Sequence, residues 1–333
     1  MKNLKNEQEV ASALKALYRS WGYTAYKMSR FEEYDLYVRN KDFLVSDRII
    51  TFSGPDGRLL AMKPDITLSI VKNAPETGVE KVYYQENVYR DFREILQMGL
   101  ECVGDLDEYE IAETALLAAK SLHLLDQGFI LNLSHRGLLE QVLSPLCGSQ
   151  KKQALDCLRR RSLHELEGFA PEMKSLLTAL SGCRTVAELE LIFPGSEAVG
   201  QLRSLMDILA QEGFANNVKL DFSIGGGLGY YSGLVFQGYL PGVPAKVLSG
   251  GQYDRLPQRM GRKARAIGFA IYLDQLPFPE PEFDLDTVML HKGAAPEKLM
   301  ALRRSLEGNV LVTEVLPEGR TWKKLITFEE EMP

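Results

Sequence analysis

Cysteine and histidine are scarce in this chain of 333 residues, which holds four of each. The cysteines lie far apart and form no CxxC pair: Cys102, Cys147, Cys157 and Cys183. Their spacing disfavours both a disulfide scaffold and a cysteine zinc site, and it is typical of reduced thiols in a cytoplasmic protein. The histidines show no metal-ligand spacing either, so the sequence predicts no metal site.

Long apolar runs and an excess of positive charge are also missing. No segment is apolar over a length that could cross a membrane, and residues 1–15 are polar and predict a helix rather than a signal sequence. The net charge of −6 disfavours a protein whose main role is to bind a nucleic-acid backbone. A hydrophobic content of 45% is typical of a soluble globular protein, and the length predicts more than one domain.

The segment over residues 81–104 predicts two antiparallel strands joined by a very tight turn. Its second half alternates with period two, so successive side chains point to opposite faces. One face is apolar and predicts core: Leu96, Met98, Leu100 and Cys102. The other face carries Gln97 and Glu101, with Gly99 between them leaving room above the sheet. Such a face is either an ordinary solvated one or the wall of a ligand site.

A second polar cluster follows a predicted β-hairpin over residues 47–62. Pro64 ends the hairpin and can open a helix, which places Asp65 and Thr67 near the helix N-terminus. Helix capping is one explanation of these two residues, because Asp and Thr are common caps. Ligand binding is the other.

A glycine run at residues 225–229 is followed by Tyr230 and Tyr231 and then by a predicted strand. A phosphate-binding glycine loop must open a helix, so this order disfavours a nucleotide site, and we expect no cofactor. The glycines instead let the backbone pass close to a small ligand, with the two tyrosines as pocket walls.

The remaining patterns predict a chain of alternating sheet and helix segments. In order, they are an amphipathic helix over 7–19, a helix capped by Asp105 or Asp107, a strand over 128–134, a leucine-rich helical insertion over about 136–213, strands over 218–223 and 234–240, and a buried apolar helix over 264–276. The basic run at 159–161 is best explained as a solvated helix face. Residues 283–333 predict one small βαβ-like unit.

Five motifs in this order resemble the catalytic domain of histidyl-tRNA synthetase, a class II aminoacyl-tRNA synthetase, over residues 1–276. They are MKPDIT, YRDF–REILQMGLE, GGGLGYYSGLVF, SGGQYDRL and AIGFAIYLDQL. The resemblance implies an α+β fold in which an antiparallel sheet is flanked by helices. It also implies the helical insertion over 136–213, with 283–333 left as a small C-terminal α/β unit.

The chain departs from this family where the synthetase binds ATP. Gly226 stands at the position of the catalytic arginine, and Gln275 at that of the arginine that stacks on adenine. Only Asp91 and Phe92 remain of a longer loop between the two hairpin strands. Activating an amino acid with ATP requires cations facing the phosphates. We therefore expect no catalytic residues and no enzymatic activity from this chain.

The resemblance retains the positions that hold the amino acid histidine: Asp65, Thr67, Gln97, Glu101, Tyr230 and Tyr231, with Arg90 as a possible addition. A synthetase-like chain without catalytic arginines resembles the regulatory subunits of ATP phosphoribosyltransferase, and so does His135 in LNLSHRGLL. That resemblance implies a cytoplasmic subunit that dimerises and joins a short-form catalytic subunit in a hetero-oligomer. It also implies that the subunit takes part in feedback inhibition of that enzyme by histidine. No tRNA and no membrane partner is expected. Two alternatives stay open, a divergent active synthetase and a paralogue that binds another amino acid or protein.

Overall fold

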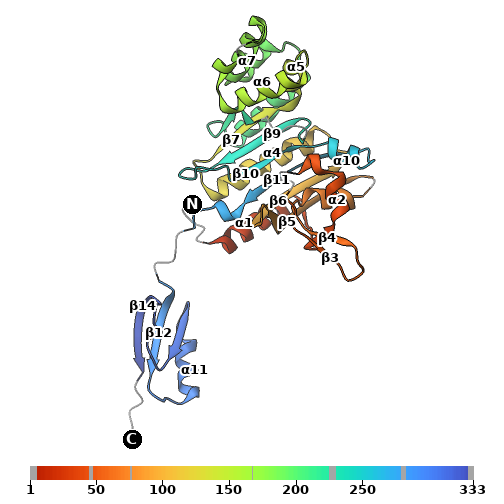
Figure 1. Ribbon diagram of the computed structural model, residues 1–333. Coiled ribbons are helices and arrows are strands. Elements are labelled where there is room, and N and C mark those ends of the chain that lie inside the picture. Colours follow the sequence, from red (N-terminus) through yellow and green to blue (C-terminus); the bar gives the residue numbers. More distant parts are fainter. Residues whose placement is uncertain are drawn as a thin grey trace. The chain divides into compact units, whose positions relative to one another are not determined.

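The computed structural model describes residues 6–44, 48–75, 77–166, 168–224, 230–278 and 283–328. The chain divides into two compact units, residues 1–277 and residues 278–333 (Figure 1). Within the described residues, no helix combines the length and the apolar character needed to cross a bilayer.

An eight-stranded mixed sheet organises the first unit, with strand order β1-β5-β6-β11-β10-β9-β7-β8. All neighbours pair antiparallel except β1 with β5 and β7 with β8. The strands are β1 (Thr24–Ala25), β5 (Val79–Arg90), β6 (Arg93–Gly104), β7 (Ile130–His135), β8 (Val218–Leu220), β9 (Leu234–Tyr239), β10 (Leu248–Gln252) and β11 (Arg265–Tyr272). This is the class II synthetase-like α+β architecture that the sequence predicts.

Strands β5 and β6 form the predicted hairpin, in which Arg90 pairs with Arg93 across a turn of two residues. Both turn residues have left-handed backbones, with φ of 51° at Asp91 and 60° at Phe92. Two positive φ values in a two-residue loop are the mark of a type I′ turn, whose twist matches that of the strands. The turn therefore fixes the register of the whole hairpin.

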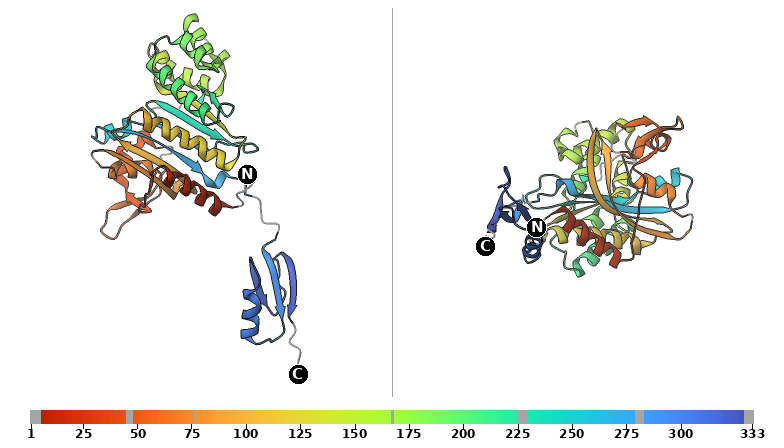
Figure 2. Two further views of the ribbon diagram at one scale, coloured as in Figure 1. Left: turned by 180° about the vertical axis from the view of Figure 1, so that it is seen from behind. Right: turned by 90° about the horizontal axis from the view of Figure 1, so that it is seen from below.

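Helices α1 (Glu7–Ser20) and α4 (Glu108–Leu125) cover one face of this sheet (Figure 2). Asp107 caps α4 in a capping box with Glu110, as one of the two predicted caps. Tyr18 on α1 lies 3.0 Å from the Ser121 hydroxyl on α4 and packs its ring edge-on against Phe269 of β11. On the apolar face of β6, Met98, Leu100 and Cys102 have no exposed surface, whereas Leu96 is half-buried.

The opposite face carries smaller elements. A three-stranded antiparallel sheet, in the order β2-β4-β3, is formed by β2 (Phe31–Glu33), β3 (Thr51–Ser53) and β4 (Leu59–Met62). Beside it lie α2 (Tyr34–Arg39), η1 (Lys41–Phe43), α3 (Thr67–Asn73) and α10 (Arg255–Arg259). An apolar cluster that includes Tyr37, Ile66, Leu68 and Tyr253 holds these elements against the main sheet. They cover that face only in part, and the uncovered part is the site described below.

Between β7 and β8 the chain is helical, as the leucine-rich pattern predicts. The elements are α5 (Arg136–Leu143), α6 (Gly148–Arg160), η2 (Leu163–Glu165), α7 (Pro171–Gly182), α8 (Val186–Ile192) and α9 (Glu197–Gln211). Leu177, Leu180 and Leu189 of these helices are fully buried, whereas Leu191 is exposed. Pro171 opens α7 at its first turn, and Thr185 caps α8 in a capping box with Glu188.

The second unit is a small parallel sheet in the order β13-β12-β14 with one helix. Its elements are β12 (Leu285–His291), α11 (Pro296–Arg304), β13 (Val310–Thr313) and β14 (Trp322–Phe328). Strand β12, helix α11 and strand β13 form the predicted βαβ unit, and β14 adds a third strand on the other side of β12.

One expectation from the sequence is wrong. Residues 264–276 were expected to form a buried helix, whereas Arg265–Tyr272 is strand β11 and Leu273–Gln275 is a 3-10 turn, η4. Strand β11 pairs with β6 on one side and β10 on the other, and both its faces are largely buried. A strand buried on both faces shows no alternation, so its apolar run resembles that of a buried helix.

The strained turn of the hairpin gives a first prediction. Phe92 is 76% exposed and holds a positive φ that costs an L-residue energy but suits glycine. We expect Phe92→Gly to raise the free energy of unfolding by about 0.5–1 kcal/mol. Urea denaturation followed by circular dichroism measures this. Phe92→Ala, which keeps the strain, should give no gain, and equal midpoints for both variants would contradict the type I′ argument.

Candidate functional site

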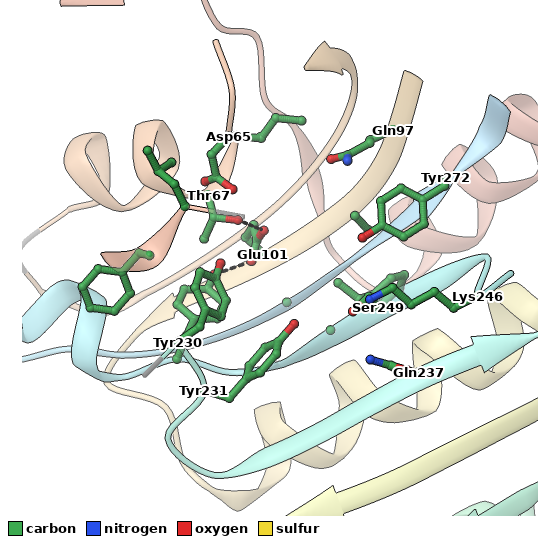
Figure 3. A pocket seen from close by; sticks show the side chains of 18 of the residues that line it. Asp65, Thr67, Gln97, Glu101, Tyr230, Tyr231, Gln237, Lys246, Ser249 and Tyr272 are labelled. Carbon is green, nitrogen blue, oxygen red and sulfur yellow. Dashed lines mark hydrogen bonds between the residues drawn. The ribbon is translucent and has the colours of Figure 1, made fainter. Parts of the chain in front are cut away.

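A cavity of about 800 Å³ opens over the face of the sheet that α1 and α4 leave free (Figure 3). Its lining comes from β5, β6, β9, β10 and β11, from the start of α3 and from the end of η1. The seven residues singled out in the sequence all line this one cavity: Asp65, Thr67, Arg90, Gln97, Glu101, Tyr230 and Tyr231. Helix α3, the central hairpin and the segment before β9 are far apart in the sequence, and the fold brings them together here.

The sheet register builds the floor of the cavity from small residues. Gly99 on β6 pairs with Ala270 on β11, and Ala270 pairs with Ser249 on β10. In the next row of the same face, Glu101 pairs with Gly268. A floor without bulky side chains leaves depth above the sheet for a ligand.

Both Gly99 and Gly268 are required for steric reasons. A Cβ at Gly268 would lie 1.7 Å from the Glu101 Oε2 atom, and one at Gly99 would lie 2.0 Å from the Phe269 carbonyl oxygen and 2.7 Å from the Tyr84 hydroxyl. Real Cβ atoms do not approach other heavy atoms so closely. Glycine at 268 therefore makes the space that the Glu101 carboxyl group occupies.

Glu101 is the buried centre of the site, with 2% of its surface exposed. The Thr67 hydroxyl donates to its Oε1 atom at 2.8 Å, and the Tyr253 hydroxyl donates to its Oε2 atom. Burial raises the pKa of this carboxyl group to about 8, against the lowering effect of these two hydroxyl groups, and the nearby Asp65 raises it further. The folded chain therefore retains the Glu101 proton at neutral pH.

Asp65 has a structural role as well as a place in the cavity. Its Oδ1 atom accepts a hydrogen bond from the Leu68 amide at 2.9 Å, which caps the first turn of α3. Its Oδ2 atom lies 3.5 Å from Arg90, whose Nε atom donates to the Pro64 carbonyl at 2.6 Å. Burial raises the pKa of Asp65, and Arg90 opposes that shift. Asp65 therefore both caps α3 and lines the cavity.

Aromatic rings form one wall of the cavity. Tyr230 packs edge-on against Tyr231 with ring centroids 4.9 Å apart, and it also contacts Tyr253 at 5.7 Å and Phe43 at 6.1 Å. Burial raises the pKa of all three tyrosines, so their hydroxyl groups remain neutral and can donate or accept hydrogen bonds. The glycine run before Tyr230, including Gly226, lies outside the described residues.

Sequence reasoning missed several lining residues. Tyr272 pairs with Gln97 across the sheet, which follows only once β11 is recognised as a strand. Tyr253 lies in the SGGQYDRL motif, where its place directly after the strand was a usable signal. Lys246 and Gln237 also line the cavity, and no local pattern marks them.

His135 lies elsewhere, in a second cavity of about 370 Å³ beside α4 and α9. Its Nδ1 atom accepts from the Gly137 amide at 3.2 Å and caps α5, while Nε2 lies 3.2 Å from the Gln201 Oε1 atom. Burial lowers its pKa, so the ring is neutral and its hydrogen bonds are satisfied. These contacts give His135 a capping role.

The buried Glu101 proton predicts a pH dependence of stability. The unfolded chain releases this proton near the ordinary pKa of 4.5, whereas the folded chain holds it to about pH 8. The folded state binds more protons in this window, so its stability falls as the pH rises from 4.5 to 8. Glu101→Gln should remove this loss and raise the Tm at pH 8.5 by at least about 4 °C, with little change at pH 4.5.

Differential scanning calorimetry across this pH range measures the effect. Glu94→Gln changes an exposed carboxylate on the same strand and serves as the control, for which we expect no change in the slope of Tm against pH. Parallel Tm curves for wild type and Glu101→Gln would contradict the assigned proton.

The chain is similar to proteins of two kinds, ATP phosphoribosyltransferase regulatory subunits and histidine–tRNA ligases. The ATP phosphoribosyltransferase regulatory subunit of Symbiobacterium thermophilum is 29% identical over 96% of this chain and 89% of its own length. The histidine–tRNA ligase of Archaeoglobus fulgidus is 25% identical over 99% of this chain and 86% of its own length.

Solved structures share the fold. A regulatory subunit/histidyl-tRNA synthetase from Bacillus halodurans superimposes with a TM-score of 0.80 at 20% identity, covering 96% of this chain and 93% of its own. A chain of the ATP phosphoribosyl transferase complex from Thermotoga maritima superimposes with a TM-score of 0.67 at 19% identity. The match covers 80% of this chain and 97% of that chain. The family model described as histidyl-tRNA synthetase matches residues 2–276. The chain therefore belongs to the histidyl-tRNA synthetase family.

Proposed function

We propose that this chain is a regulatory subunit of ATP phosphoribosyltransferase, the enzyme of the first step of histidine biosynthesis. One observation carries the proposal: the cavity keeps together the family's amino-acid-binding positions, while the arginines that serve ATP are replaced. The similarity to proteins named as such regulatory subunits supports it, at 25% to 29% identity over most of the chain.

The replacements argue against amino-acid activation. Gln275, on η4, offers no charge where the family has an adenine-stacking arginine, and Gly226 offers no side chain. Asp91 and Phe92 are the only residues between the paired Arg90 and Arg93, where the family has a longer loop that reaches ATP. Removing one group that stabilises developing charge costs a factor of about 10²–10³ in rate. We therefore propose that this subunit has no catalytic residues of its own.

The chemistry of the cavity suits histidine. A carboxyl group such as that of Glu101 can accept a hydrogen bond from an imidazole N–H, and the neutral hydroxyl groups of Tyr253 and Tyr231 can donate to the other ring nitrogen or accept from it. Asp65 supplies a carboxylate for the α-ammonium group, and the tyrosine rings give flat apolar walls. We propose histidine as the ligand, held by Asp65, Thr67, Gln97, Glu101, Tyr230 and Tyr231, with Arg90 at the margin through its pairing with Asp65.

The proposed partner is a short-form catalytic subunit, joined in a hetero-oligomer that also contains a homodimer of this chain. The structural neighbour from Thermotoga maritima is described as part of an ATP phosphoribosyl transferase complex, which supports this assembly. The cytoplasm is the proposed compartment, in keeping with free thiols at all four cysteines. We propose no contact with tRNA.

Feedback inhibition by histidine then follows from the linkage between histidine binding and the activity state of the complex. Histidine shifts the complex toward the less active state only if it binds that state more tightly, and the coupling acts equally in both directions. The cavity offers the ligand contacts from which such a difference in affinity can arise.

A divergent synthetase is the second candidate, because the similarity to the Archaeoglobus fulgidus ligase spans nearly the whole chain. Histidine-dependent exchange of pyrophosphate into ATP by the purified chain would establish it. The replaced arginines predict that no exchange is seen.

Reconstitution tests the regulatory function. The purified chain is mixed with a short-form ATP phosphoribosyltransferase from the same organism, and phosphoribosyl-ATP formation is followed with and without histidine. We expect activity only in the mixture and suppression of that activity by histidine. If the catalytic subunit is equally active alone, the regulatory proposal is wrong, and the fold assignment stands.

The ligand contacts are tested in the same assay with Glu101→Ala. Loss of a hydrogen bond to a charged ligand should raise the histidine concentration for half inhibition by about 10–100-fold, while activation of the catalytic subunit remains. Glu94→Ala, on the exposed end of the same strand, is the matched control and should change neither quantity. If histidine inhibits the complex with Glu101→Ala as strongly as it inhibits the wild-type complex, the assignment of histidine to this cavity is wrong.

A further inference from the structure

Among the described residues, Lys246 is a lysine inside the cavity that has no counter-ion. Lys246 precedes β10, and its side chain runs into the cavity so that the ammonium group lies beside Ser249 (Figure 3). Among the residues that the structure describes, no carboxylate lies within ion-pair distance of its Nζ atom. Burial lowers the pKa of Lys246, and the nearby Arg90 lowers it further. Its surroundings therefore disfavour the charge that the ammonium group carries.

A second donor in the cavity is also unsatisfied. The Nε2 atom of Gln97 is buried and has no hydrogen-bond partner among the described residues, and only 3% of the Gln97 surface is exposed. Leaving a buried donor without a partner costs about 1–3 kcal/mol in typical proteins, so such a group marks a place where a ligand belongs. Gln97 pairs across the sheet with Tyr272, which with Lys246 forms the same end of the cavity (Figure 3).

The charged groups of the cavity are thus separated. The acceptors, Glu101 and Asp65, lie with Thr67, and Asp65 already has Arg90 as its partner. Arg159 also lines the cavity, but it pairs with Asp156 at 2.9 Å. Lys246 is left as the cation that needs an anion, next to an amide donor that needs an acceptor. A carboxylate satisfies both at once.

We propose that Lys246 and Gln97 bind the α-carboxylate of the amino-acid ligand and so restrict the cavity to ligands with a free carboxylate. The inference rests on the proposed function, because it takes histidine as the ligand. The carboxylate supplies the counter-ion of Lys246 and the acceptor for the Gln97 Nε2 atom. Analogues in which the carboxylate is replaced by an uncharged group leave Lys246 without a counter-ion and bind weakly.

Isothermal titration calorimetry of the full chain with L-histidine and L-histidinol tests this. Histidinol keeps the imidazole and the ammonium group but carries an alcohol in place of the carboxylate. Wild type should bind histidine about 10–100-fold more tightly than histidinol. Lys246→Met should weaken histidine by a similar factor and change histidinol by less than about threefold. Lys246→Arg should keep most of the preference, because it keeps the charge.

Lys219→Met, on the exposed side of β8, is the control for removing one lysine and should leave both affinities unchanged. Thermal melts of each variant verify folding. If Lys246→Met weakens the binding of histidine and of histidinol equally, or changes neither affinity, the carboxylate assignment is wrong. Histidine binding to the cavity would still stand. If wild type binds neither compound, the histidine cavity itself is wrong, and the role of Lys246 falls with it.

Discussion

The site depends on one buried carboxyl group. Glu101 lies under the cavity with almost no surface exposed, and burying it requires space and donors at the same point. Gly268 provides the space, and the hydroxyl groups of Thr67 and Tyr253 provide the hydrogen bonds. These partners come from α3, β11 and the end of β10, so one carboxyl group ties three distant segments to the central hairpin.

The distribution of charge within the cavity agrees with a zwitterionic ligand. Carboxyl groups gather near Thr67, and Gln97 and Lys246, donors with no partner among the described residues, lie near Tyr272. An amino acid with an imidazole side chain can pair with both ends at once. Phosphate groups would need several cations together, and among the described lining residues Arg90 already pairs with Asp65 and Arg159 with Asp156. The same sheet that supports ATP chemistry in a synthetase thus becomes, in this proposal, a sensor for the amino acid alone.

The proposed loss of amino-acid activation is compatible with the fold, because catalysis and folding depend on different residues. Strand β11 packs against α4 and β5 packs against α1, whereas Gln275 lies on η4, after the end of β11. Shortening the hairpin to a type I′ turn preserves the register of β5 and β6. In the proposed regulatory subunit, the cavity is therefore kept although the arginines that serve ATP are replaced.

The sequence alone determined what depends on local pattern: the central hairpin, the capped helix α4, and the common face of Gln97 and Glu101, since strand alternation has a fixed period. It did not determine that residues 265–272 form a strand, because a segment buried on both faces shows no alternation. Only the pairing of β6, β11 and β10 placed Tyr272 and Gly268 opposite Gln97 and Glu101. Lys246 entered the cavity the same way, through contacts between segments too distant in the chain for any local pattern to reveal.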